Sequence, residues 1–101
     1  MARTPEGKVK DKVVAILKEH GAYYFFPATG GYGRSGVPDI VCCFQGRFIA
    51  FECKAGKNTV TALQNREILA IQDAGGMAFV IQDNNTDLVS GVLKLLKEGK
   101  V

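Results

Sequence analysis

Apolar residues alternate between two spacings along the chain. Spacing at three and four residues predicts helices, and short apolar runs bounded by turn residues predict strands. Helices are predicted from 5 to 20, from 62 to the glycines at 75 and 76, and from 86 to 97, and strands at 22–27, 39–45, 47–54 and 77–82. The predicted order is αβββαβα, without an internal repeat or linker.

Capping residues fix the predicted ends of the first two helices. Thr4-Pro5 combines a capping side chain with proline at the first helical position, and Gly21 ends that helix. Thr61 and Gln64 have the spacing of a capping box, in which each side chain bonds the other residue's backbone. The residues at 84–86 are expected to cap the last helix.

One α/β domain over residues 1–101 is expected, because 101 residues suffice for one core. The strands on either side of the second helix should be joined by a crossover and lie parallel. The two strands before that helix read as a hairpin turning at Gln45-Gly46. We therefore predict a mixed four-stranded sheet flanked by helices.

The hairpin is expected to bring two carboxylates and an amine to one face. Strand side chains alternate with period two, so with a two-residue turn Asp39 faces Glu52, and Lys54 shares their face. A four-residue turn would place Asp39 opposite Lys54 with the same face shared. Facing carboxylates repel, which gives no stability reason to build the pair. Such oxygen clusters bind hard cations such as Mg²⁺, and a nearby lysine suits a phosphate or an attacking water.

Other residues are open to two interpretations. Glu6 extends the buried stripe of the first helix, and it fits a functional carboxylate as well as a partner for the helix dipole. The glycine-rich segment 29–36 is either a plain connection or a backbone that approaches a phosphate, with Arg34 as a contact. Tyr32 could stack on a base or pack, and Lys57 is a further candidate DNA contact. No phosphate-loop spacing supports a nucleotide cofactor.

Composition narrows the class of protein. The net charge of +3 and pI near 8.8 permit a nucleic-acid partner without requiring one. Three cysteines, all in the hairpin, lack the spacing of a zinc site and read as core residues. Their odd number and the absence of a secretory signal or a membrane-length apolar run suggest a cytoplasmic protein that binds no membrane.

Pro38-Asp39 and the Glu52-Cys53-Lys54 triplet, in their strand context and followed by Gln64, resemble the PD-(D/E)XK nuclease superfamily, and most closely its VRR-NUC branch. The resemblance covers roughly 4–83 and leaves the last helix, about 86–98, outside the shared core. It implies a restriction-endonuclease-like fold and Mg²⁺- or Mn²⁺-dependent phosphodiester hydrolysis. It implies metal ligation by Asp39, Glu52, Glu6 and the Cys53 carbonyl, with Lys54 acting on the water and phosphate and Gln64 joining the site.

Small members of that branch resemble phage proteins that dimerise and cut branched DNA such as four-way junctions. The resemblance therefore implies branched DNA as substrate and a homodimer, in a bacterial or phage-infected cytoplasm. Two other hypotheses compete with it. One is a non-catalytic nucleic-acid-binding module of the same fold, which the intact Asp39, Glu52 and Lys54 argue against. The other is a thiol-based redox or metal protein centred on the cysteines.

Overall fold

The computed structural model describes residues 3–28 and 33–100. It contains the seven predicted elements in the predicted order. They are α1 (Pro5–His20), β1 (Tyr23–Phe25), β2 (Ile40–Phe44), β3 (Arg47–Cys53), α2 (Ala62–Asp73), β4 (Met77–Ile81) and α3 (Asp87–Lys97). Tyr32 lies outside the described residues.

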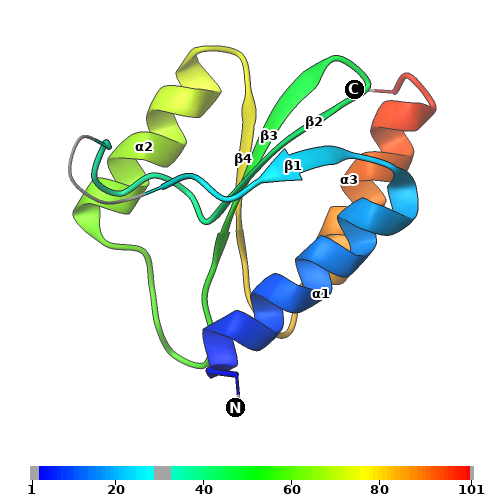
Figure 1. Cartoon of the computed structure of the whole chain (residues 1–101). Coiled ribbons are helices and arrows are strands. Elements are labelled where there is room, and N and C mark those ends of the chain that lie inside the picture. Colours follow the sequence, from blue (N-terminus) through cyan, green and yellow to red (C-terminus); the bar gives the residue numbers. More distant parts are fainter. Residues whose placement is uncertain (1–2, 29–32, 101) are drawn as a thin grey trace.

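The strands form one mixed sheet in the order β1-β2-β3-β4. The first three strands are antiparallel neighbours, and β4 lies parallel to β3, joined to it through α2 as expected. Helices α1 and α3 pack together on one face of the sheet, and α2 covers the other (Figure 1). The predicted α/β class and mixed four-stranded sheet are confirmed.

The hairpin register sets the geometry of the candidate site. Phe44 pairs with Arg47 around the two-residue turn Gln45-Gly46, and Ile40 pairs with Phe51. Both turn residues have positive φ, which suits the tight hairpin turn. Continuing this register by one residue places Asp39 across from Glu52, as the two-residue turn predicts.

The larger hydrophobic core lies between the sheet and the α1–α3 layer. Alternate residues of the strands point into it, and three helical positions of α1 complete one side, namely Val9, Val13 and Leu17. The smaller core beneath α2 contains Ala50, Ile68 and Ala78. Strand β3 is therefore covered on both faces from Ile49 to Cys53. A charged side chain on this strand must be accommodated inside the protein.

The helix caps predicted from the sequence are present at two of three helix N-termini. Thr4 accepts a hydrogen bond from the Gly7 amide, and Gly21 ends α1 in the left-handed conformation. Thr61 and Gln64 form both bonds of the capping box at α2. At α3 the expected side-chain cap is wrong, because the N-cap Thr86 makes no such bond within the described part of the chain.

Strand bounds differ from the prediction mainly at β1. The expected strand at 22–27 shortens to three residues, because β1 is an edge strand and pairs only with residues 41–43 of β2. Pro27 has no amide hydrogen with which to extend the ladder. The other strands end within one residue of the predicted bounds.

No helix in the described ranges has the length and apolar character needed to cross a membrane.

Candidate active site

The candidate site lies at one end of the sheet, where β2 begins and β3 ends. Antiparallel pairing brings Asp39 and Glu52 to the same end, and Lys54 follows directly after β3. Glu6 comes from the first turn of α1, and Gln64 from the first turn of α2. The amino ends of two helices therefore meet at this point, and their partial positive charge favours carboxylates.

Glu52 is the centre of the site. It is 3 % exposed, and its Oε2 accepts a hydrogen bond from Gln64 Nε2 at 3.1 Å. Its Oε1 is buried without a hydrogen-bond partner among the described residues. Burial, followed by the charge of Asp39, raises the pKa of Glu52 to about 7, although Lys54 acts in the opposite direction. This carboxylate is built into the protein at an energetic cost.

Lys54 lies beside Glu52 and is also buried. Its Nζ is 3.5 Å from Glu52 Oε2, and its side chain is 10 % exposed. Its backbone amide donates to the carbonyl of Ile81, which continues the β3–β4 ladder past the end of the strand. The amine thus faces the carboxylate and is held there by the sheet. Glu52 and Lys54 therefore do not form a solvated strand face.

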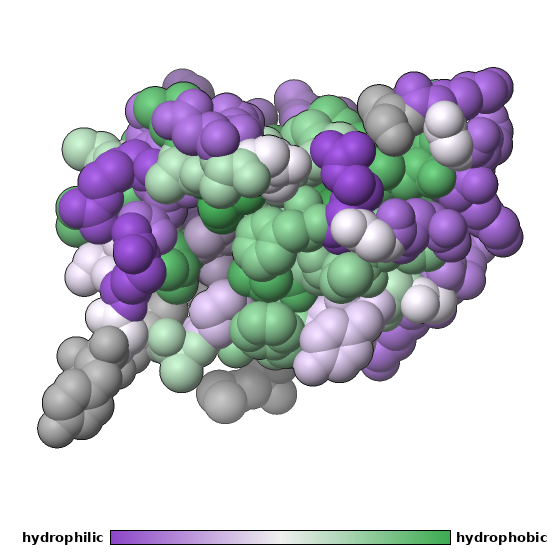
Figure 2. Space-filling model, turned by 90° about the horizontal axis from the view of Figure 1, so that it is seen from above, coloured by the Kyte–Doolittle hydropathy of each residue, from purple (hydrophilic) through white to green (hydrophobic). Residues whose placement is uncertain are grey.

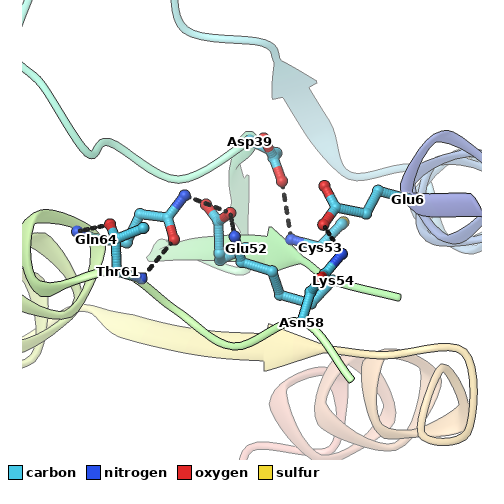
Figure 3. Close-up of polar contacts among 8 residues, drawn as sticks. All are labelled: Glu6, Asp39, Glu52, Cys53, Lys54, Asn58, Thr61 and Gln64. Atoms are coloured by element: carbon cyan, nitrogen blue, oxygen red, sulfur yellow. Dashed lines mark hydrogen bonds and ion pairs between the residues drawn. The ribbon is translucent and has the colours of Figure 1, made fainter. Parts of the chain in front are cut away.

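Asp39 is tied to the end of β3. Its Oδ2 accepts a hydrogen bond of 2.8 Å from the backbone amide of Cys53 (Figure 3). This bond spans two strands, so Asp39 is not simply capping the turn after Pro38. The bond fixes Asp39 beside Glu52 and Cys53. A carboxylate that is only half-buried and keeps its second oxygen free of this bond can still bind a cation.

Gln64 serves both the helix and the site. Its Oε1 accepts from the Thr61 amide at 2.9 Å, and its Nε2 donates to Glu52. The capping box therefore fixes the rotamer that presents the amide nitrogen to the carboxylate. The structure thus places Gln64 next to Glu52, and its role in the site stays a prediction.

Glu6 reaches toward the group from α1, on the side opposite Gln64 (Figure 3). Its Oε1 accepts from Asn58 Nδ2 at 3.1 Å, a contact between residues 52 positions apart. Its charge raises the pKa of Glu52, as the weakest of the causes. Glu6 is near the carboxylate pair, and its role as a metal ligand stays a prediction.

The donor set fits a hard divalent cation that brings further ligands with it. Within residues 3–28 and 33–100, no three His, Cys, Asp or Glu side chains form a ready-made metal cluster. Mg²⁺ is usually held by only one or two carboxylates together with waters and substrate phosphates. Oε1 of Glu52, which has no hydrogen-bond partner within residues 3–28 and 33–100, lies beside Asp39 and matches that arrangement.

The two predicted DNA contacts that the structure describes, Lys57 and Arg34, have different surroundings. Lys57 is exposed and lines a surface pocket together with Glu6 and Asn58. Arg34 forms a two-point ion pair with Glu67 on α2. Sequence reasoning missed Asn58 and Glu67, because a loop asparagine and a helical glutamate carry no distinctive spacing.

The cysteines give no support to thiol chemistry. All three are free, with Cys42 and Cys53 buried and Cys43 exposed, as expected for neighbours on opposite faces. Burial raises the pKa of Cys42 and of Cys53 to about 12, which keeps these thiols protonated and unreactive. Cys42 and Cys53 are core residues, as predicted, but the same prediction is wrong for Cys43, which points to the opposite face of β2 and is exposed.

Comparison with known families decides the class of this chain. Residues 6–85 match the family model of the archaeal Holliday junction resolvase (Hjc). The chain belongs to the Hjc family. The matched segment contains every candidate metal ligand of this Hjc-family protein, together with Lys54 and Gln64. The PD-(D/E)XK type of nuclease is thereby supported, and the narrower VRR-NUC assignment stays a prediction.

A solved structure agrees with the fold of this Hjc-family chain. The chain is similar to Hjc of Archaeoglobus fulgidus, a Holliday junction resolvase from an archaeal hyperthermophile, with a TM-score of 0.57 and 20 % identity. The similarity covers 74 % of this chain but only 65 % of that resolvase. At this identity it shows a shared fold. A search of curated proteins found no match.

Proposed function

We propose that this Hjc-family protein is a metal-dependent endonuclease that hydrolyses phosphodiester bonds in branched DNA, four-way junctions above all. The observation that carries the proposal is Oε1 of Glu52, which is buried beside Asp39 with no hydrogen-bond partner in the described part of the chain. A fold that needed only stability would place an apolar residue there, because an unsatisfied buried acid is costly. The family match supplies the substrate class.

A divalent metal ion, Mg²⁺ or Mn²⁺, would supply positive charge to the attacked phosphate and make the attacking water more acidic. Asp39 and Glu52 would hold it, with Glu6 and the Cys53 carbonyl as further ligands. Opposite charge at that point would lower the pKa of Glu52 and keep the carboxylate ionised at neutral pH.

The chain's own residues have separate tasks in this proposal. Lys54 presents its amine beside the carboxylates, where it orients the attacking water and stabilises charge on the phosphate. Gln64 occupies one oxygen of Glu52 and leaves the other for the ion. Asp39 is held by the Cys53 amide, so the two carboxylates keep their spacing before substrate arrives.

The proposal is tested with a panel of labelled substrates in Mg²⁺ and in Mn²⁺. The panel contains single-stranded DNA, duplex, flap and four-way junction of matched sequence. We expect cleavage that needs the metal and is strongest on the junction. Tight junction binding with no cleavage in either metal would favour the non-catalytic binding module instead.

In cells, a nuclease of this kind would act on recombination or repair intermediates in the cytoplasm, and phage replication is one setting that fits.

We also propose that the protein works as a homodimer, since a four-way junction presents paired strands to be cut. One sheet face supports this. Tyr23, Cys43 and Phe48 lie side by side across β1, β2 and β3, and all three are exposed. Figure 2 shows apolar side chains gathered over the middle of one side of the molecule, with polar residues around them. Such a patch is typical of protein interfaces.

Light scattering on the Tyr23→Asp variant tests the dimer. Tyr23 is 70 % exposed on the edge strand, so the monomer should still fold. We expect a mass near twice 10.9 kDa for the wild type and a monomer for the variant. Leu95→Asp, which changes an exposed apolar residue of α3, is the matched control. A wild-type protein that is monomeric and fully active would contradict the proposed homodimer.

A further inference from the structure

Glu67 is a buried carboxylate that the proposed chemistry does not use. It lies on α2 with its side chain 7 % exposed, on the turn after Gln64. Three residues along a helix correspond to about 4.5 Å along its axis, so Glu67 lies close to the catalytic end of α2. A buried acid there requires cationic partners.

Two arginines surround this single carboxylate. Arg34 donates through Nε at 3.0 Å and through Nη2 at 2.9 Å, one to each oxygen of Glu67. Arg66 lies on the neighbouring helical position, with its Nε 3.5 Å from Glu67 Oε2 and its Nη2 3.5 Å from the carbonyl of Ser35. The group carries two positive charges against one negative charge. It therefore keeps a surplus positive charge at the protein surface.

Both guanidinium groups remain open to solvent. The side chains of Arg34 and Arg66 are 70 % and 57 % exposed. A guanidinium has five N–H donors, and Arg34 directs two of them at Glu67. The remaining donors point away from the carboxylate. The ion pair holds the pKa of Glu67 below its usual range, so the anchor stays charged at neutral pH.

The segment that carries Arg34 is pressed against the start of α2. Gly36 has a φ of +80°, and a Cβ there would lie 2.6 Å from the backbone carbonyl carbon and oxygen of Leu63. Three residues later the same segment supplies Asp39. Arg34, Arg66 and Asp39 are thus held by two elements, the segment before β2 and α2, that are in contact at Gly36 and Leu63.

We infer that Arg34 and Arg66, anchored on the buried Glu67, form a clamp that binds the phosphate backbone of the DNA strand entering the active site. Glu67 is a positioning residue in this clamp, and the two arginines touch the substrate. The inference rests on the proposed function, because it takes junction DNA as the ligand. It adds a binding site, an anchor and a second arginine to the predicted phosphate contact of Arg34.

The clamp makes an unusual prediction for Glu67→Gln. Removing a negative charge near DNA should tighten binding if only net charge matters. If Glu67 instead positions Arg34, its loss frees the guanidinium and should weaken binding about fivefold. Arg34→Gln and Arg66→Gln should each weaken binding about tenfold and reduce the slope of log Kd against log salt by roughly 0.9.

The experiment measures the affinity of the full chain for a fluorescent four-way junction by anisotropy, from 50 to about 300 mM salt. All proteins carry Glu52→Gln, so that no strand is cut. Arg47→Gln is the matched control, since it removes the same charge at the hairpin turn, about 17 Å along β3 from the site. It should leave affinity within twofold of the parent protein.

Circular dichroism and urea unfolding establish that each variant is folded. Should Glu67→Gln unfold, Arg34→Lys takes its place, because it keeps the charge at a largely exposed position and loses the two-point anchor. It should weaken binding while leaving the salt slope unchanged.

Two results would overturn the clamp: salt slopes of Arg34→Gln and Arg66→Gln equal to that of Arg47→Gln, or tighter binding by Glu67→Gln. A parent protein that does not bind the junction at all contradicts the proposed function instead. The two failures are therefore distinguishable.

Discussion

Glu52 shows the conflict between stability and function at the scale of one residue. Its carboxyl group is buried, faces a second acid and leaves one oxygen unpartnered among the described residues. Lys54 offsets part of this repulsion from 3.5 Å. Since a neutral side chain would remove the cost, the arrangement is best explained by a ligand of positive charge.

The raised pKa of Glu52 predicts a specific pH dependence of stability in the metal-free protein. Its pKa is about 7 in the folded state and near 4.5 when unfolded, so the folded state binds the proton more tightly. The free energy of unfolding should therefore fall as pH rises from about 4.5 to 7, by roughly 3 kcal/mol. Urea unfolding of wild type and Glu52→Gln in EDTA measures this.

Glu52→Gln removes the titrating group and should lose that part of the pH dependence. The free energies of unfolding of the two proteins should differ least near pH 4. Above that pH, the free energy of unfolding of the variant should rise relative to that of the wild type up to pH 8. Added Mg²⁺ should restore stability to the wild type at pH 8 and do little for the variant. A difference between the two proteins that is constant with pH would show that Glu52 is not held at a raised pKa.

Lys54 should affect the chemical step more than metal binding. Lys54→Ala removes a positive charge from beside the phosphate, and loss of such a group typically costs about 100-fold or more in turnover. Metal affinity should stay the same or rise, because a repelling charge is gone. Single-turnover cleavage and calorimetric Mg²⁺ titration separate the two effects. Lost metal binding with normal turnover at saturating Mg²⁺ would refute this role.

The pairing of residues on neighbouring strands could be predicted from the sequence, whereas contacts between distant segments could not. The period-two alternation placed Asp39, Glu52 and Lys54 on one face in either of the two registers considered, and the structure has the two-residue turn that sets Asp39 opposite Glu52. Asn58 and Glu67 bond to partners 52 and 33 positions away. No local pattern encodes those separations, since they depend on how α1 and the segment before β2 pack on the rest.

At the scale of elements, the contact of the segment around Gly36 with the start of α2 holds the site together. This segment leads into Asp39, and α2 supplies Gln64 and Glu67.

Capping and turn residues predicted the helices well because they act through neighbours in sequence. Strand β1 was predicted too long, because an edge strand is limited by its partner and by Pro27.

Gly36→Ala should loosen this contact. The new Cβ would meet the Leu63 backbone at 2.6 Å, and alanine disfavours the φ of +80°. Gly46→Ala is the control, since Gly46 has a φ of +76° and a Cβ there meets no described atom within 4 Å. Urea unfolding should show a loss from Gly36→Ala that exceeds the control by about 1–3 kcal/mol. Equal losses would show that the close approach matters little.

At the scale of the whole molecule, three layers place all the candidate chemistry at one end of the sheet. The first turns of α1 and α2, the start of β2 and the end of β3 supply Glu6, Gln64, Asp39 and Glu52 to one group (Figure 3). The hairpin turn lies at the other end of β2 and β3, and the exposed aromatic face lies along β1 to β3. The carboxylate pair therefore lies at one end of β3, and Phe48 of the proposed dimer patch lies near the other end, where it lines a pocket together with Arg34 and Glu67.

The central claim is that Asp39 and Glu52 hold the metal ion that drives cleavage. The most direct measurement compares wild type with Glu52→Gln for cleavage and binding of one four-way junction in Mg²⁺. We predict that the variant cuts at least about 1,000 times more slowly, because the ion loses a ligand, while its affinity for the junction changes less than threefold. Equal cleavage by the two proteins would contradict the account.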